Sequence, residues 1–94
     1  MANNFDEIVS VLAQTDNTDT IAEIMRALLS PAEINDIEAR WEIVKRLERG
    51  ISQRQIAKDL HLSLCKITRG SKELKKNAVL KNIVHNITSK EDNT

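Results

Sequence analysis

The stretch from residue 50 to 71, GISQRQIAKDLHLSLCKITRGS, constrains the fold more than any other part of the chain. It has the pattern of two short helices joined by a tight turn. Ser52 is typical of a helix N-cap, and Gln55, three residues later, completes a capping-box pattern. These signals predict a helix-turn-helix over about residues 53–70, a motif whose second helix enters the major groove of DNA.

Apolar residues recur at helical spacing on both sides of this turn, so each helix has one face suited to a core. These residues are Ile56, Ala57, Leu60, Leu64, Ile67 and Leu74. His61 stands at the turn position that usually holds glycine, and histidine tolerates positive φ better than most residues. Ser63 is placed to cap the second helix, which we expect to continue past Gly70 toward Lys76.

Two further helices are expected before residue 30. Residues 4–14 have apolar side chains at helical spacing. These are Phe5, Ile8, Val9 and Leu12. The polar break TDNTD follows, and it offers helix caps at Asp16 and Asp19. The second helix has its apolar residues at positions 21, 24, 25 and 28, and we expect it to end near Leu29.

The clearest local signal begins the third helix. Ser30 is a suitable N-cap, Pro31 favours the first helical position, and Glu33 completes a capping box. We expect this helix to run to about Arg49 and to end at Gly50. Its apolar stripe is formed by Ile34, Ile37, Trp41, Val44 and Leu47.

A last amphipathic helix is expected from residue 78, and the tail at residues 89–94 is expected to be frayed. Strand-like alternation of apolar and polar residues is not found in the sequence. The predicted fold is therefore all-α, with about six helices in a single domain spanning residues 1–94.

Charge is divided unevenly along a chain whose formal net charge is zero. Residues 1–42 hold nine acidic and two basic residues, whereas residues 43–90 hold twelve basic and three acidic ones. The basic half contains the helix-turn-helix, as expected for a surface that faces phosphates. Basic side chains also simply solvate helix faces, but their coincidence with the motif favours nucleic-acid binding.

Several classes of function are disfavoured. No apolar run is long enough to span a bilayer, and no secretory leader is apparent. A single cysteine, Cys65, suits a reducing cytoplasm. His61 and His85 lack metal-ligand spacing with Cys65 or with each other, so no metal site is expected. Catalytic motifs are also missing, so we do not expect an enzyme.

Three residues are not explained by DNA binding alone. Gly70 lies inside a predicted helix, where glycine costs about 1 kcal/mol relative to alanine. Either two helices pack closely at Gly70, or a flat ligand lies against its backbone. Arg69 is adjacent, and Arg40 lies on the third helix. Two guanidinium planes can sandwich an aromatic ring and bind a carboxylate, although ordinary surface arginines would look the same.

The segments LLSPAEI, ARWEIVKRLERG, ISQRQIA and KITRGSKELK resemble the tryptophan repressor family over about residues 28–75. The resemblance implies an intertwined homodimer that binds a near-palindromic operator of tryptophan biosynthesis or uptake genes when L-tryptophan, its corepressor, is bound. It implies no other cofactor. Two alternatives remain: a helix-turn-helix regulator that ignores tryptophan, and a helical protein-interaction module.

By the same resemblance, Arg40 and Arg69 would flank the indole ring, and the Ser30 hydroxyl would bond the ligand carboxylate. Carbonyl groups before Ser30 would receive the ligand ammonium group. The full predicted tryptophan site is Ala27, Leu29, Ser30, Arg40, Val44, Arg69, Gly70 and Glu73.

Residues of both motif helices would contact double-stranded DNA, with Arg54 the best candidate for guanine recognition. The predicted set is Gln53, Arg54, Lys58, Leu64, Cys65, Lys66, Thr68, Lys72 and Lys75. One departure from the family pattern concerns the ligand. Glu73 stands where the family commonly has a serine that helps to hold the ammonium group. A carboxylate there either binds the ammonium more strongly or disturbs the pocket.

Overall fold

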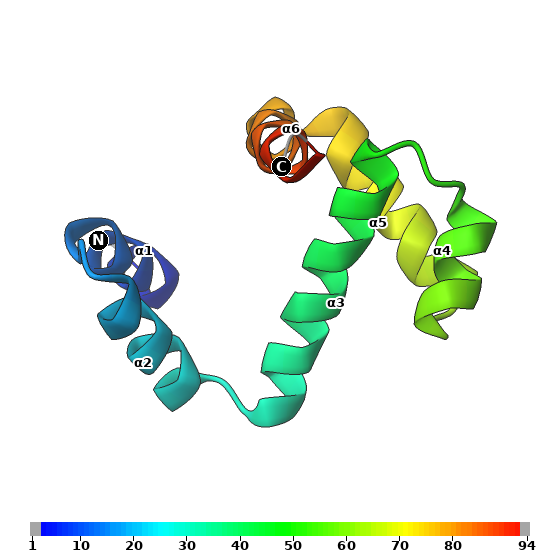
Figure 1. The fold of residues 1–94 in the computed structure, drawn as a ribbon. Helices are drawn as coiled ribbons and strands as arrows, with labels where there is room; N and C mark the ends of the chain where they lie inside the picture. Colours follow the sequence, from blue (N-terminus) through cyan, green and yellow to red (C-terminus); the bar gives the residue numbers. More distant parts are fainter. Residues whose placement is uncertain (1–2, 93–94) are drawn as a thin grey trace. The chain divides into compact units, whose positions relative to one another are not determined.

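The computed structural model describes residues 3–92, and every regular element in that range is a helix (Figure 1). The predicted all-α fold with six helices is therefore confirmed. In chain order the helices are α1 (Asn4–Gln14), α2 (Thr18–Leu28), α3 (Pro31–Glu48), α4 (Gln53–Leu60), α5 (Leu64–Lys76) and α6 (Ala78–Asp92). The chain divides into two compact units, Met1–Asn35 and Asp36–Thr94, which are described separately.

Asparagine side chains cap the two helices of the N-terminal unit. The Oδ1 of Asn3 accepts a hydrogen bond from the backbone N–H of Asp6 at 2.8 Å, and α1 follows. The Oδ1 of Asn17 accepts from the N–H of Thr20 at 3.0 Å, and α2 begins at the next residue. The predicted caps at Asp16 and Asp19 are therefore wrong, because Asn17 satisfies the free N–H groups at the start of α2.

The amphipathic helices of this unit bury little of their apolar surface. Within the described residues, neither α1 nor α2 contains a buried side chain. Phe5 is 71% exposed, and Ile8, Val9 and Val11 are exposed as well. Large exposed apolar faces on small proteins are typical of surfaces that take part in interactions.

The capping box at the start of α3 forms as expected. The Oγ of Ser30 accepts a hydrogen bond from the backbone N–H of Glu33 at 3.2 Å, and the Glu33 carboxylate accepts one from the N–H of Ser30 at 2.8 Å. This backbone N–H bond is the main cause that lowers the pKa of Glu33. At the other end, Gly50 has φ +86°, a conformation that glycine adopts readily.

Two adjacent residues of α3 form the centre of the C-terminal unit. Ile43 packs with Ile56 of α4 and Ile67 of α5, and all three are buried. Val44 belongs to a second cluster, and its buried partners are Leu74 of α5 and Val84 of α6. Helix α5 contributes a residue to both clusters. It therefore packs with α4 in the first cluster, with α6 in the second, and with the C-terminal end of α3 in both (Figure 1).

The predicted apolar stripe of α3 is only partly right. Ile37 and Trp41 are exposed, at 42% and 38%, whereas Ile43, which the stripe omitted, is 2% exposed. The reason is that the other helices of this unit pack against the C-terminal end of α3, on two sides. At that end two residues adjacent in sequence, Ile43 and Val44, are both buried. A single stripe of apolar residues at helical spacing does not describe this pattern.

The two helices expected in the motif form at Gln53–Leu60 and Leu64–Lys76, and a tight turn joins them. His61 ends α4 in the left-handed conformation, with φ 56° and ψ 43°. Ser52 caps α4 by accepting a hydrogen bond from the N–H of Gln55 at 3.2 Å. The side chain of Gln55 bonds Asp59 instead of reaching back to Ser52, so only half of the expected capping box is present.

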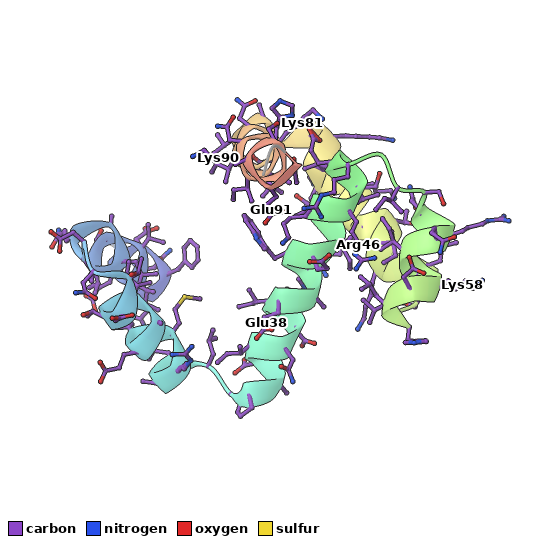
Figure 2. The ribbon with its side chains drawn as sticks, in the orientation of Figure 1. Glu38, Arg46, Lys58, Lys81, Lys90 and Glu91 are labelled. Atoms are coloured by element: carbon purple, nitrogen blue, oxygen red, sulfur yellow. The ribbon has the colours of Figure 1, made fainter. Side chains whose placement is uncertain are left out.

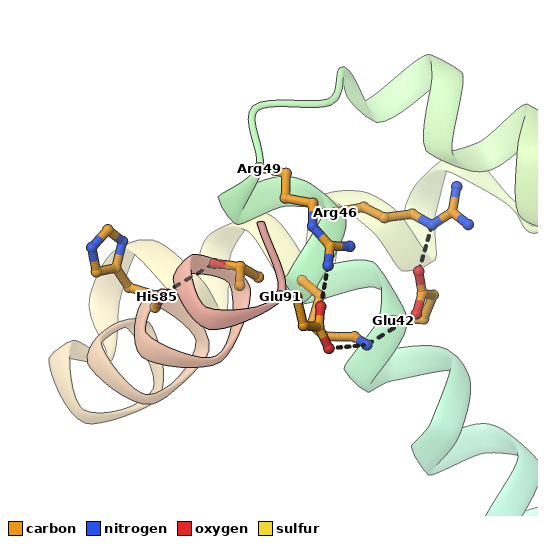
Figure 3. Close-up of polar contacts among 7 residues, drawn as sticks. Glu42, Arg46, Arg49, His85 and Glu91 are labelled. Carbon is orange, nitrogen blue, oxygen red and sulfur yellow. Dashed lines mark hydrogen bonds and ion pairs between the residues drawn. The ribbon is translucent and has the colours of Figure 1, made fainter. Parts of the chain in front are cut away.

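Two other expectations for the motif and the tail are corrected. The Ser63 side chain makes no capping hydrogen bond at the start of α5, although its backbone has the extended conformation of a cap. Leu64, expected on the buried side of α5, is 45% exposed. Residues 89–92 are helical instead of frayed, because Glu91 pairs with Lys45 at 3.7 Å and also with Arg49 of the segment after α3 (Figure 3). Residues 93–94 of the predicted tail lie outside the described range.

The two serine caps of the motif give a matched test. Replacing Ser52 by alanine removes an observed capping bond and should lower the free energy of unfolding by about 1 kcal/mol. Ser63→Ala removes no such bond and should cost clearly less. Urea unfolding followed by far-UV circular dichroism measures both. Equal losses in the two variants would contradict this assignment of the caps.

Candidate ligand pocket and nucleic-acid interface

A pocket opens in the C-terminal unit between α3, α5 and α6. Its volume is about 490 Å³, within the range typical of small-molecule sites. Most of its accessible lining is apolar, and charged side chains are also present. The residues that line it are Asp36, Ile37, Ala39, Arg40, Trp41, Ile43, Val44, Lys66, Arg69, Gly70, Glu73 and Leu80.

Five of the eight residues predicted to hold tryptophan line this pocket. They are Arg40, Val44, Arg69, Gly70 and Glu73. Within residues 3–92, neither arginine forms an ion pair with a carboxylate. Guanidinium groups that lack an internal partner at an apolar pocket are suited to bind an anionic group on a ligand.

The other three predicted residues, Ala27, Leu29 and Ser30, belong to the N-terminal unit and are not among the residues that line the pocket. Their part in the site remains a prediction. The Oγ of Ser30 already accepts the Glu33 N–H, and its hydroxyl proton remains available for donation.

Sequence reasoning missed several residues of the pocket wall. Leu80 comes from α6, and the sequence contains no signal that this residue would face α3. Asp36 lies four residues before Arg40, so the two start from the same face of α3, and this spacing could have identified it.

Gly70 allows α5 to approach α3 closely. A Cβ atom added at Gly70 would lie 2.9 Å from Cγ2 of Ile43 and 3.8 Å from Cγ1 of Val44. Close helix packing, one of the two explanations offered for this glycine, is therefore sufficient to account for it. Gly70 also lines the pocket, so the same approach of the helices shapes one of its walls.

The exposed face of α4 carries two cations. Arg54 and Lys58 are both exposed and lie four residues apart, and Figure 2 places Lys58 on the outer side of the helix. Gln53, at the start of α4, is half-buried, and its Oε1 accepts a hydrogen bond from the Thr68 hydroxyl at 2.9 Å. This bond ties the two motif helices together at residues that were both expected to contact DNA.

The outer face of α5 gathers four of the predicted DNA-binding residues around a shallow groove. They are Leu64, Cys65, Thr68 and Lys72, joined by Arg69, Glu73 and Lys76. Lys75 is exposed elsewhere on the helix, and Lys66 lines the ligand pocket. The α5 helix therefore lines both the pocket and an exposed, mainly basic groove, and Arg69 and Glu73 belong to both.

Ion pairs connect the C-terminal end of α3 with its neighbours. Arg46 donates a hydrogen bond to Glu42 at 2.7 Å within α3 (Figure 3). It also lies 3.6 Å from Asp59 of α4. The bond from Arg46 is the main cause that lowers the pKa of Glu42.

A carboxylate that is largely covered joins α3 to α6. The Glu48 side chain is 9% exposed, and its oxygens lie 3.1 Å from Nζ of Lys81 and 3.4 Å from Nδ1 of His85. Across the part of the chain that the structure describes, no group of three His, Cys, Asp or Glu side chains is placed to hold a metal ion. No helix in that range is both long and apolar enough to cross a membrane.

Comparison with known proteins identifies one family. The family model described as "Trp repressor protein" matches residues 3–86. A "Trp operon repressor homolog" from Xylella fastidiosa (strain M23) is 34% identical over 76 residues, which cover 80% of this chain and 83% of the relative.

Relatives from two Vibrio species have the same description. The protein from Vibrio parahaemolyticus is 33% identical over 73 residues, covering 77% of this chain and 71% of its own length. The protein from Vibrio cholerae is 32% identical over 74 residues, covering 78% and 72%. The search of solved structures found no significant match.

The contact at Gly70 predicts an unusual sign for a glycine substitution. In an open helix Gly→Ala stabilises by about 1 kcal/mol, but at Gly70 the new methyl group would collide with a buried β-branched side chain. Overpacking costs about 1–3 kcal/mol, so Gly70→Ala should lower the midpoint of urea unfolding. A raised midpoint would show that α3 and α5 approach less closely than described.

The lowered pKa of Glu42 predicts a dependence on pH. A carboxylate whose pKa is depressed by folding stabilises the protein above its ordinary pKa of 4.5, and this contribution is lost as the pH falls through the folded-state pKa. Glu42→Gln should therefore destabilise at neutral pH and progressively less below pH 4.5. In an Arg46→Met background the substitution should have little effect at either pH. An effect that does not change with pH would contradict the prediction.

Proposed function

Because the chain belongs to the Trp repressor family, we propose that it is an L-tryptophan-dependent transcriptional repressor of tryptophan biosynthesis or uptake genes. Members of this family are transcription regulators and not enzymes, and the family implies binding to operator DNA. The observation that carries the proposal is that α5 belongs both to the pocket and to the helix-turn-helix. This helix forms a wall of the pocket and is also the second helix of the helix-turn-helix.

The mechanism follows from this shared position. Tryptophan in the pocket would place its carboxylate on the two guanidinium groups, and its indole ring against Gly70 and Val44. The bound ligand would then hold α5 at a set distance from α3. Since α5 is the helix that enters the major groove, ligand binding and operator binding would favour the same arrangement of the helix and would strengthen each other.

We propose that the active form is a homodimer in the cytoplasm. The apolar faces of α1 and α2 have no buried side chain among the described residues, and a second copy of the chain would cover them. A symmetric dimer presents two copies of α5 about one DNA turn apart, and this spacing matches a near-palindromic operator. The exposed basic residues of both motif helices would position the dimer on phosphates, while Arg54 would read a guanine.

The alternative is a regulator with the same fold that does not respond to tryptophan. It would bind DNA through the same face of α4 and α5, but its affinity for DNA would not depend on the ligand. A helical protein-interaction module would lack a steep dependence of DNA affinity on salt concentration.

An operator gel shift with and without L-tryptophan distinguishes these functions. The protein is expected to bind a near-palindromic operator of its own tryptophan genes, with affinity increased at least about tenfold by tryptophan. Arg40→Ala, on a helix outside the DNA-binding motif, should weaken tryptophan binding by about tenfold or more through loss of a charge-assisted hydrogen bond, and should reduce the response to the ligand.

Arg54→Ala is the matched control, since it removes a guanidinium group from the motif and leaves the pocket intact. It should weaken operator binding and leave tryptophan affinity, measured by isothermal titration calorimetry, unchanged. Operator binding by the unaltered protein that is equally strong with and without tryptophan would favour the alternative regulator.

A further inference from the structure

The ligand pocket contains an acid and a base from each of its two principal helices. Asp36 and Arg40 come from α3, while Arg69 and Glu73 come from α5. In each pair the two residues are four positions apart, so they start from one face of the helix about 6 Å apart along its axis. The pocket therefore offers partners for both charges of a zwitterion, next to apolar walls.

Glu73 is well placed to receive a positive charge. It follows Gly70 by three residues, so it lies one turn beyond the surface against which a flat ring would rest. Its carboxylate lies 3.1 Å from Nζ of Lys76, and the two side chains are 46% and 68% exposed. Ion pairs this exposed contribute about 0–1 kcal/mol, so a ligand ammonium group can replace Lys76 at little cost.

We infer that Glu73 makes this pocket selective for the α-amino group of its ligand. Asp36 adds a second negative charge to the pocket lining. The inference rests on the proposed function and specifies it further. The ammonium of L-tryptophan would donate a charge-assisted hydrogen bond to the Glu73 carboxylate while its own carboxylate pairs with guanidinium.

An indole carboxylate that lacks the amine would leave the Glu73 charge without this partner. Any pose that brings its carboxylate toward Glu73 would also meet like-charge repulsion. The pocket would thus favour the amino acid by two means, a new attraction and a repulsion of its deaminated analogue.

Isothermal titration calorimetry of the full chain with L-tryptophan and with indole-3-propionate tests the inference. The unaltered protein should prefer tryptophan by at least about tenfold, the effect of one charge-assisted hydrogen bond. Glu73→Gln keeps the shape of the side chain and removes its charge, and it should reduce this preference by about tenfold. Glu73→Lys should invert the preference, because its ammonium group would repel the ammonium of tryptophan, which indole-3-propionate lacks.

Glu38→Gln is the matched control. Glu38 is an exposed glutamate of α3 that does not line the pocket, so its replacement makes the same change in net charge (Figure 2). The ratio of the two affinities should stay within about twofold of the unaltered protein, since exposed charges at a distance are largely screened. Circular dichroism of each variant checks that the helices are retained.

The outcomes separate this inference from the proposed function. Tryptophan binding with a preference that Glu73→Gln and Glu73→Lys leave unchanged overturns the role of Glu73 while the repressor function stands. If the unaltered protein binds neither compound, both the inference and tryptophan dependence are overturned.

Discussion

The close approach of α5 to α3 at Gly70 is the contact on which the rest of the C-terminal unit depends. With no side chain at Gly70, the backbone of α5 comes within reach of Ile43 and Val44, and these two residues lie at the centres of the two buried clusters. One cluster fixes α4 against α5, and the other fixes α6. A movement of α5 relative to α3 would therefore disturb both small cores at once, and it would change the width of the pocket between the same helices.

In the proposed function, this arrangement would connect a ligand to DNA without a long pathway. The pocket and the groove on the exposed face adjoin each other along one helix, since Arg69 and Glu73 line both. The hydrogen bond between Gln53 and Thr68 links the two motif helices. A ligand that sets the distance between α3 and α5 thereby sets the position of the whole helix-turn-helix.

Much of the local structure could be predicted from the sequence. Ser30, Ser52 and Gly50 have the roles expected of them, and the left-handed turn falls at His61. The same reasoning placed caps at Asp16 and Asp19, where Asn17 makes the capping bond instead, because several polar residues near a helix start compete for the same few N–H groups. Which of them forms the bond depends on small differences in backbone geometry that composition does not contain. Ser63 stands at the expected cap position, but its side chain makes no capping bond.

The candidate site could be predicted from the sequence only in part, for a similar reason. Family resemblance indicated Arg40, Arg69 and Gly70, and these residues do line one pocket. Asp36 and Leu80 were missed because their place at the pocket depends on how α3, α5 and α6 pack, and residues far apart in the chain meet only after packing.

The sequence by itself determined the helical class, the turn at the centre of the motif and the division of charge, since these follow from side-chain spacing and from backbone preferences of single residues. The tertiary structure alone decided that Ile43 is buried while Trp41 is exposed, and that residues 89–92 stay helical. The burial of a residue and the stability of a helix end depend on the elements that pack against the helix. An amphipathic pattern does not identify those elements.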